Sequence, residues 1–348
     1  MLKRLLIIGL GSIGARHARL ARELLPNLEI TVLRHGRCPE NSEPGIDYCV
    51  NSLTDALRHN PQAAVISNPA TLHLEAAIPL ARAGVHLLLE KPIAEAPHGV
   101  AELIELCRAH RLVLMTGYNL RFLPSLQRFR EFLREERVGR VLSVRAEIGQ
   151  FLPAWRPGSD YRQTVSAKAA LGGGVLLELS HDIDYLRWLF GEVQWVSAIH
   201  RKQSDLEIDV EDTAYLTLGF EVADRATSLV ASLNMDFIRH DTTRCCNVIG
   251  DKGSLRWNAL TGTVDMFEPG ANAWQIVFSH QHQRDDSYLA QWQHFLNCIS
   301  GTETPLVGGD DGLRVLRIVE AARRSSTRGA IEMVNNSNNE LLQTKDMA

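Results

Sequence analysis

The stretch LLIIGLGSIGARHARLARELL, residues 5–25, decides the fold class of the chain. Its apolar opening, residues 5–10, predicts a buried β-strand, and apolar residues recur at helical spacing over residues 13–25, until the chain reaches Pro26. The turn between them is a G-x-G-x-x-G motif. A strand, a glycine-rich turn and a helix in this order predict the start of a βαβ unit.

The glycine motif at residues 9–14 also predicts a ligand. In such a turn the first glycine permits the tight bend, the second lets a pyrophosphate approach the backbone, and the third lets helix and strand pack closely. The helix N-terminus adds unpaired N–H groups and a partial positive charge. We therefore predict that a dinucleotide binds at Gly9, Gly11, Ser12, Ile13 and Gly14.

Short apolar runs continue to alternate with helical patterns through the first third of the chain. They predict strands at residues 29–34, 63–68, 85–90 and 112–117. Alternation of this kind is typical of a parallel sheet with helices on both faces. We expect an α/β fold in which residues 1–121 form a doubly wound Rossmann domain.

The pattern changes near residue 122, where alternating runs follow one another with few helices between them. These runs predict strands at residues 140–152, 193–202, 213–222, 227–237, 243–250 and 254–258. We expect a second, α+β domain over residues 122–333, with a largely antiparallel sheet that leaves one face open. Two helices stand out, at 176–190 and at 310–326; we expect the second to pack back on the first domain, and a polar tail at 334–348.

Composition and charge exclude several classes of protein. An apolar fraction of 45%, a charged fraction of 22% and a net charge of −4 are those of an ordinary globular protein, which argues against fibres, membrane spanning and nucleic-acid binding. The first apolar run is too short for a signal peptide. The 6 cysteines show neither C-x-x-C nor Cys/His ligand spacing, so we expect no metal site and reduced thiols in a cytoplasmic protein.

The residue that reads the adenosine ribose is expected about twenty positions after the glycine motif, which is Arg34. Asp or Glu at this place accepts a hydrogen bond from the ribose 2′-hydroxyl of NAD, whereas a guanidinium group suits the 2′-phosphate of NADP. Arg34 and His35 make the loop basic, so we predict NADP or NAD as the cofactor, with NADP favoured. In the alternative, Arg34 stacks on adenine or faces solvent.

Glu90, Lys91 and Pro92 follow the predicted strand at 85–90. Ligands of an open α/β sheet bind beyond the carboxyl ends of its strands, so we expect Lys91 to point at the cofactor crevice. Pro92 fixes the turn and is compatible with a cis Lys–Pro bond. Without this context, a lysine at a strand end is more often a solvated cap.

Glu178, His181 and Asp184 recur every three residues within the predicted helix at 176–190, a spacing that puts them on one helix face. Oxidation of an alcohol needs a base for the hydroxyl proton, and histidine titrates in the required range. We therefore predict that His181 acts as an acid/base. The alternative is a structural histidine hydrogen-bonded between carboxylates.

Several motifs occur in a recognisable order: GLGSIG, SNPATLHLEAA, EKP, GYNLRF, LGGGVLLELSHDIDYLRWLFG and GDKGSL. Over residues 3–333 the chain resembles the Gfo/Idh/MocA family, which includes glucose–fructose oxidoreductase and inositol dehydrogenases. The resemblance implies a Rossmann domain followed by an open-faced sheet of about six strands, with the active site between them. It also implies a homodimer or homotetramer formed through the outer face of that sheet.

The resemblance also implies roles for individual residues. Lys91 matches the lysine that contacts the substrate hydroxyl, and His181 matches the acid/base. Glu178 is the candidate for an acidic substrate ligand, although the family commonly has Asp four positions before the histidine. The remaining matches are Asn68, Pro69 and His73 in the loop on the nicotinamide side, and Tyr118, Asn119 and Arg121 in the segment that enters the second domain, where we expect substrate contacts. We also expect Glu90 at the cofactor and Asp184 at the substrate.

Residues 151–174 depart from the common family pattern and are rich in Trp, Arg, Tyr and Lys. They resemble a branch associated with bacterial surface-polysaccharide and sialic-acid-type sugars. Trp155 and Tyr161 offer aromatic faces. Donors for a phosphate or carboxylate are Arg156, Arg162 and Lys168. An acidic or nucleotide-linked sugar fits this set, and a lid or a subunit contact is the alternative.

These observations predict an NAD(P)-dependent oxidoreductase that transfers a hydride between nicotinamide and a hydroxyl-bearing carbon of a sugar, inositol or nucleotide-sugar. Two alternatives keep the fold: a redox-neutral enzyme that recycles a tightly bound NAD, and a dinucleotide sensor without catalysis. The presence of both Lys91 and His181 argues against the sensor.

Overall fold

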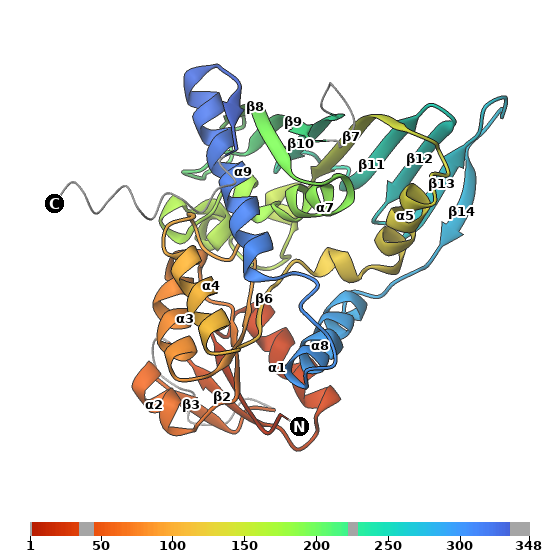
Figure 1. Cartoon of the computed structure of the whole chain (residues 1–348). Coiled ribbons are helices and arrows are strands. Elements are labelled where there is room, and N and C mark those ends of the chain that lie inside the picture. The colour runs from red at the N-terminus through yellow and green to blue at the C-terminus, as the bar shows by residue number, and fades with distance from the viewer. Residues whose placement is uncertain (1, 35–44, 222–228, 335–348) are drawn as a thin grey trace. The chain divides into compact units, whose positions relative to one another are not determined.

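The computed structural model of the chain describes residues 2–34, 45–221 and 229–334 (Figure 1). It has two compact units. The first comprises Met1–Gln127, Ala169–Gly173 and Gln281–Leu313, and the second comprises Arg128–Lys168, Gly174–His280 and Arg314–Ala348. The units interleave along the chain, whereas the sequence pattern predicted a single change of domain near residue 122.

The first unit contains a six-stranded sheet in the order β3-β2-β1-β4-β5-β6. Its strands are β1 (Arg4–Ile8), β2 (Glu29–Leu33), β3 (Tyr48–Val50), β4 (Ala63–Ile66), β5 (His86–Leu89) and β6 (Leu114–Thr116). Every neighbouring pair is parallel, which confirms the predicted Rossmann sheet. The short strand β3 was not expected, because its sequence, YCV, is too brief to show a period.

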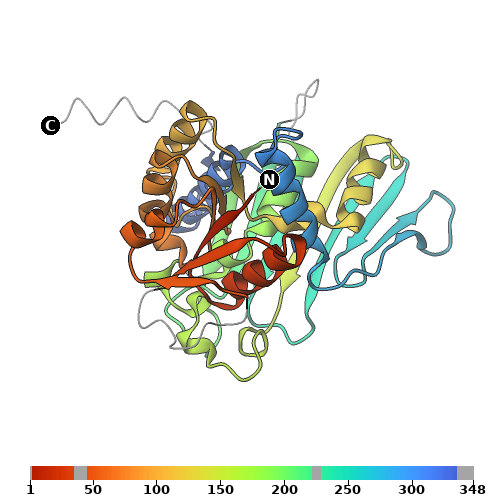
Figure 2. The same cartoon turned by 90° about the horizontal axis from the view of Figure 1, so that it is seen from below.

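Helices cover both faces of this sheet. They are α1 (Ser12–Leu24), α2 (Leu53–Arg58), α3 (His73–Arg82), α4 (Val100–Ala109) and α8 (Asp286–Ile299), with 3-10 turns η1 (Ala70–Leu72) and η2 (Asn119–Phe122). Figures 1 and 2 show α1 and α8 on one side of the sheet and α3 and α4 on the other.

Helix α8 lies far downstream of the other helices of the first unit in the sequence. Its side chains Trp292 and Phe295 are fully buried and join the core around Leu5, Ile7 and Leu20. Burial of two aromatic side chains stabilises this unit by about 3–6 kcal/mol. The Rossmann core is therefore completed by a helix that lies, in the sequence, within the expected second domain at residues 122–333.

The second unit contains a nine-stranded sheet in the order β14-β13-β12-β11-β7-β10-β9-β8-β15. Its strands are β7 (Val141–Gly149), β8 (Val193–Arg201), β9 (Thr213–Phe220), β10 (Leu229–Asp236), β11 (Thr243–Gly250), β12 (Gly253–Asn258), β13 (Thr263–Phe267), β14 (Gln275–Ser279) and β15 (Glu332–Met333). Only β7 and β10 pair in parallel, so the predicted, largely antiparallel sheet is confirmed for the part of the chain described. Strands β13 and β14 at one end of the sheet and β15 at the other extend it beyond the strand number that the family resemblance implied.

One face of this sheet carries helices and the other is open. Figure 1 shows α5 (Pro124–Arg134) and α7 (His181–Phe190) against one face. On neighbouring strands, Ile199, Tyr215 and Val230 are 54%, 48% and 40% exposed. Helix α9 (Gly309–Arg328), expected at residues 310–326, begins in the first unit and ends in the second.

The helix expected at residues 176–190 is interrupted. The structure has a short α6 (Val175–Glu178) followed by α7, so Glu178 ends one helix and His181 begins the next. The prediction that Glu178, His181 and Asp184 share one face of a continuous helix is therefore wrong.

The physical reason lies in the backbone between α6 and α7. The N–H groups of Ser180 and Asp182 donate to carbonyls three residues back rather than four, as in a 3-10 turn. A spacing of three in the sequence fits either geometry, so it could not reveal the break.

The thiols of Cys107, Cys245, Cys246 and Cys298 are free. Burial raises the pKa of Cys107 and of Cys298 to about 11, so both stay protonated at neutral pH. Cys49 is disulfide-bonded, and the expectation of uniformly reduced thiols is wrong at this position.

Candidate active site

The glycine turn between β1 and α1 has the geometry that a dinucleotide needs. Gly9 has a φ of +85°, and a Cβ there would lie 2.8 Å from the Asn68 nitrogen. A Cβ on Gly14 would lie 2.0 Å from the Gly9 oxygen, so this glycine lets α1 pack closely on β1. A Cβ on Gly11 would meet nothing within 4 Å. The backbone of Gly11 therefore faces open space at the N-terminus of α1.

Ser67, which follows β4, holds this turn from the neighbouring strand. Its hydroxyl donates to main-chain oxygens at 3.0 Å (Ile8) and 2.9 Å (Gly9). Ser12 is exposed and Ile13 is half-buried in the first turn of α1. The N–H groups of a first helical turn have no partner within the helix, so this turn can bind an anion.

Asn68, Pro69 and His73 lie together beyond the carboxyl end of β4. His73 is buried, with Nε2 2.8 Å from the main-chain oxygen of Asn68 and Nδ1 3.3 Å from the main-chain oxygen of Ile93. Desolvation by this burial lowers the pKa of His73. Within the residues described, no hydrogen bond reaches the buried Asn68 Oδ1. A buried acceptor of this kind suits a ligand N–H group, such as a carboxamide. This loop therefore fits the nicotinamide side of a dinucleotide.

Arg34 directly follows β2, and its backbone N–H donates to the Val50 oxygen at 3.0 Å. It thus lies at the carboxyl end of β2, where the residue that reads the ribose was expected. His35 lies outside the described residues.

Lys91 lies at the carboxyl end of β5, in a turn where the Lys91–Pro92 peptide is cis, the form that the sequence allowed. The Lys91 backbone N–H donates to Glu90 Oε2 at 3.3 Å. Glu90 is only 8% exposed, and its Oε1 lies 2.8 Å from Nε2 of His17 on α1. A buried carboxylate therefore braces the turn that carries Lys91.

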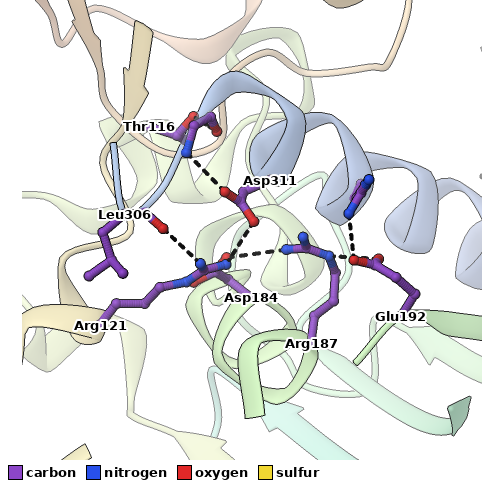
Figure 3. A network of polar contacts seen from close by, with 9 residues as sticks. Thr116, Arg121, Asp184, Arg187, Glu192, Leu306 and Asp311 are labelled. Carbon is purple, nitrogen blue, oxygen red and sulfur yellow. Dashed lines mark hydrogen bonds and ion pairs between the residues drawn. The ribbon is translucent and has the colours of Figure 1, made fainter. Parts of the chain in front are cut away.

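Tyr118, Asn119 and Arg121 are all buried in or next to η2. The Arg121 guanidinium donates to a main-chain carbonyl at 3.0 Å and pairs with Asp311 at 3.1 Å (Figure 3). Asn119 Nδ2 donates to a serine hydroxyl of α8 at 2.9 Å. These contacts tie η2 to α8 and to the start of α9. A role in substrate binding stays a prediction for all three.

In the second unit, His181 opens α7 and Asp184 lies one turn later. His181 is partly exposed, whereas Asp184 is buried and lies 3.9 Å from the Arg187 guanidinium (Figure 3). Arg187 also donates to Glu192 at 2.9 Å. Asp184 thus belongs to an ion-pair network that runs from the buried Asp184 to the partly exposed Glu192, and its substrate role also stays a prediction.

Glu178 accepts a hydrogen bond from the Ser166 hydroxyl at 2.7 Å, which joins α6 to the loop at residues 151–174. The loop contains the 3-10 turns η3 (Leu152–Ala154), η4 (Tyr161–Gln163), η5 (Val165–Ala167) and η6 (Ala169–Leu171). This contact keeps Glu178 near the loop although it has left the face of α7.

A small pocket lies within this loop. Its lining is formed by Leu152, Pro153, Trp155, Arg156, Ser159, Tyr161, Thr164 and Ser166. Trp155 is fixed by donating from Nε1 to a main-chain carbonyl at 3.1 Å, and the Tyr161 hydroxyl accepts from a backbone N–H at 3.2 Å. The structure thus brings two predicted aromatic residues and one predicted cation, Arg156, together.

Two other cations of the loop are engaged with protein groups. Arg162 pairs with Asp160 at 2.8 Å and with Glu207 at 3.0 Å, and these carboxylates raise its pKa. Lys168 donates to the Gln163 side chain at 2.7 Å. The structure therefore places Arg156, rather than Arg162 or Lys168, on the pocket.

Two further properties concern the described part of the chain. None of its helices is both long and apolar enough to cross a membrane. It contains no cluster of three or more His, Cys, Asp or Glu side chains arranged to hold a metal ion.

Two family descriptions match most of the chain. Residues 3–118 match an oxidoreductase family with an NAD-binding Rossmann fold, and residues 130–334 match the C-terminal alpha/beta domain of the same family. The chain belongs to the Gfo/Idh/MocA family of oxidoreductases. The residues of the glycine turn fit the dinucleotide that this Rossmann fold binds.

Individual relatives extend over nearly the whole chain. Myo-inositol 2-dehydrogenase from Thermotoga maritima is 26% identical over 334 residues, which are 92% of this chain and 96% of that protein. A levoglucosan dehydrogenase in complex with NADH and levoglucosan has a TM-score of 0.82 at 20% identity, covering 96% and 99% of the chains. The WlbA dehydrogenase from Bordetella pertussis, in complex with NADH and UDP-GlcNAcA, has a TM-score of 0.79 at 23% identity, with the same coverage. These structures confirm the fold.

Three residues that support the candidate site, Ser67, His17 and Trp292, were not expected from the sequence. Ser67 carries a signal that could have found it, a hydroxyl at the carboxyl end of a strand beside the glycine turn. His17 carries another signal, because it lies one helical turn after Gly14 and therefore on the same side of α1 as that closely packed glycine. Trp292 carries none, since nothing local shows that α8 returns to the first unit.

Proposed function

We propose that this oxidoreductase transfers a hydride between a nicotinamide dinucleotide and a hydroxyl-bearing carbon of a sugar, inositol or nucleotide-sugar. The observation that carries the proposal is the open backbone at Gly11, at the N-terminus of α1, in the unit that also presents Lys91 at a strand end. The glycine turn would hold the diphosphate, and Asn68, Pro69 and His73 would hold the nicotinamide side. The bound cofactor supplies the hydride acceptor or donor.

Lys91 and His181 carry the proton chemistry in this proposal. Lys91 would donate to the reacting oxygen and stabilise the developing alkoxide by a few kcal/mol. His181 would take the hydroxyl proton during oxidation and return it during reduction. Glu178, held by Ser166, and Asp184 would orient the substrate.

The test is turnover with a panel of sugars, inositols and nucleotide-sugars, followed by the absorbance of the reduced nicotinamide. Lys91→Ala and His181→Ala should each lower kcat by about 100-fold or more while leaving the Kd for the dinucleotide within about threefold. Lys252→Ala, which removes an exposed lysine between β11 and β12, is the matched control and should keep wild-type kcat. Wild-type turnover in either site variant removes that residue from the scheme.

The same assay separates the two alternatives. A redox-neutral enzyme that recycles its NAD, or a dinucleotide sensor, produces no net change in nicotinamide absorbance with any substrate. The presence of Lys91 and His181 and the relatives named as dehydrogenases support net hydride transfer instead.

We infer that the cofactor is NADP in preference to NAD. The support is Arg34, a guanidinium group at the carboxyl end of β2 where NAD-specific sites usually have a carboxylate. Arg34→Ala should weaken NADP binding by about tenfold and leave NAD binding unchanged. Equal losses for both dinucleotides would mean that Arg34 contacts a shared part of the cofactor.

We infer an acidic or nucleotide-linked sugar as the substrate class. The support is the loop pocket, where Arg156 lies with Trp155 and Tyr161, and the WlbA complex with UDP-GlcNAcA among the structural relatives. Arg156→Ala should raise KM for acidic or nucleotide-linked sugars about tenfold and leave KM for a neutral inositol unchanged. An equal change for both classes would favour a lid or subunit contact.

We also propose a homodimer or homotetramer that covers the open face of the nine-stranded sheet. The support is the row of exposed apolar residues that includes Ile199, Tyr215 and Val230. Light scattering should give a multiple of the chain mass, and Tyr215→Glu should reduce it. The cytoplasmic location stays a prediction, which fractionation of cells can test.

A further inference from the structure

Three buried side chains from distant parts of the first unit form one hydrogen-bonded series. His17 on α1 is fully buried, and its Nε2 lies 2.8 Å from Oε1 of Glu90. Trp292 on α8, also fully buried, donates from Nε1 to Nδ1 of His17 at 2.9 Å. The series therefore connects α8, the helix that opens at the glycine turn, and the turn that carries Lys91.

The chemistry of the three groups fixes the direction of both hydrogen bonds. The Trp292 indole N–H can only donate, so Nδ1 of His17 must accept. The proton of the neutral imidazole then resides on Nε2, which donates to Glu90. One tautomer of His17 satisfies both neighbours, so Trp292 determines which nitrogen of His17 faces Glu90 as a donor.

The other oxygen of Glu90 lies against the turn that carries Lys91. Oε2 accepts from the Lys91 backbone N–H at 3.3 Å. Gly117, at the end of β6, makes room for this arrangement, because a Cβ there would lie 3.0 Å from Oε2 and 3.1 Å from the Glu90 Cα. The carboxylate is therefore held on one side by His17 and on the other by the main chain of Lys91.

We propose that His17 and Trp292 are positioning residues for Lys91, acting through Glu90. The inference rests on the proposed function, in which Lys91 contacts the reacting oxygen. His17 orients the carboxylate, and the carboxylate fixes the main chain from which the Lys91 side chain extends. Because a catalytic group displaced by 1 Å costs about 100-fold in rate, loss of this support should lower kcat more than it changes substrate or cofactor binding.

A purely structural role is the competing explanation, and the burial of these side chains makes it a real one. Trp292 belongs to the core with Phe295, and His17 lies against Tyr288 and Trp292 with ring centroids 5.8 Å apart in each case. The test must therefore separate the hydrogen bonds from the packing. Glutamine at position 17 does so, since its amide can donate to Glu90 and accept from Trp292, whereas leucine can do neither.

The experiment compares full-length wild type, His17→Gln, His17→Leu and Trp292→Phe. Each protein is measured for kcat, KM, the Kd of the dinucleotide, melting temperature and deuterium uptake of the peptide that contains Lys91. We expect His17→Leu to lower kcat by about tenfold or more, to leave KM and Kd within about threefold, and to speed deuterium uptake at Lys91. We expect His17→Gln to restore kcat and uptake to within about threefold of wild type.

Contrary results are equally specific. The inference is overturned if folded His17→Leu keeps wild-type kcat, or if His17→Gln is as slow as His17→Leu. Should His17→Leu fail to fold, Trp292→Phe decides, because it keeps an aromatic ring in the core while removing the indole N–H donor. Unchanged kcat and uptake in that variant also overturn the inference. Deuterium uptake can be measured without a substrate. Failure of the proposed positioning role is therefore distinguishable from failure of the proposed function, in which wild type turns over no member of the panel.

Discussion

Substitution of Gly11 by alanine tests the cofactor site with the least disturbance of the fold. Gly11 is the N-cap of α1, with φ −73° and ψ −172°, a conformation that alanine adopts without strain. An added Cβ would meet no atom within 4 Å. The free energy of unfolding should therefore fall by only about 0.5 kcal/mol, the usual difference between glycine and alanine at an N-cap.

The effect on cofactor binding should be much larger. The methyl group would occupy the space through which a pyrophosphate approaches the backbone of α1. Loss of one hydrogen bond to a charged group costs about 1.5–3 kcal/mol, which corresponds to a Kd about 10–150 times weaker. The Kd can be measured by titrating the protein with NADH or NADPH and following nucleotide fluorescence.

Gly14→Ala is the matched comparison, because its Cβ would lie 2.0 Å from the Gly9 oxygen. This variant should lose about 1–3 kcal/mol of stability through overpacking, in addition to cofactor affinity. Chemical denaturation separates the two variants. A wild-type Kd in Gly11→Ala would refute the reasoning, since it would show that no phosphate approaches that backbone.

Three further predictions concern polar side chains. Burial raises the pKa of Asp182 to about 6 from an ordinary 3.8, and Arg244 at 3.2 Å only partly opposes this. Because the folded state holds the Asp182 proton more tightly than the unfolded state, this group stabilises the fold fully below about pH 4, and about 3 kcal/mol of the free energy of unfolding is lost as the pH rises through about 6. Asp182→Asn should flatten this part of the curve of stability against pH. An unchanged curve would mean that another group titrates. Arg121→Met should destabilise the protein by about 3–5 kcal/mol in urea unfolding, because it leaves Asp311 without its buried partner, and a loss below about 1 kcal/mol would show that the pair is not structural. Ser67→Ala should cost about 1 kcal/mol and weaken dinucleotide binding severalfold, since the glycine turn loses both hydrogen bonds from the Ser67 hydroxyl, and unchanged affinity would show that the turn keeps its shape without them.

Local patterns revealed most of the first unit. Apart from β3, each strand of the parallel sheet coincides with an apolar run in the sequence. The glycine motif marks the bend from β1 to α1. Such features are decided within about ten residues, so one sequence is enough to read them. The role of Gly14 also followed, because its tightest contact is the Gly9 oxygen, only a few residues away in the sequence. Gly9, in contrast, lies against the main chain of Ser67 and Asn68, which follow the neighbouring strand β4.

Long-range features were not predictable in the same way. Helix α8 has an ordinary amphipathic sequence, and nothing in it shows that Trp292 and Phe295 fill the Rossmann core. The Arg121 guanidinium contacts Leu306 and Asp311, which lie 185 and 190 residues away in the sequence, and no local pattern could show these contacts. The break before His181 escaped detection because a spacing of three fits both a helix and a tighter turn.

The return of α8 to the first unit has a consequence for how the protein is made. A ribosome finishes β1 to β6 long before it reaches residues 286–299. Until then, the nascent Rossmann sheet exposes the apolar surface that Trp292 and Phe295 later cover. A gene truncated after residue 127 would leave that surface permanently bare. The cofactor-holding half is therefore not a detachable module, and it can reach its native core only near the end of translation.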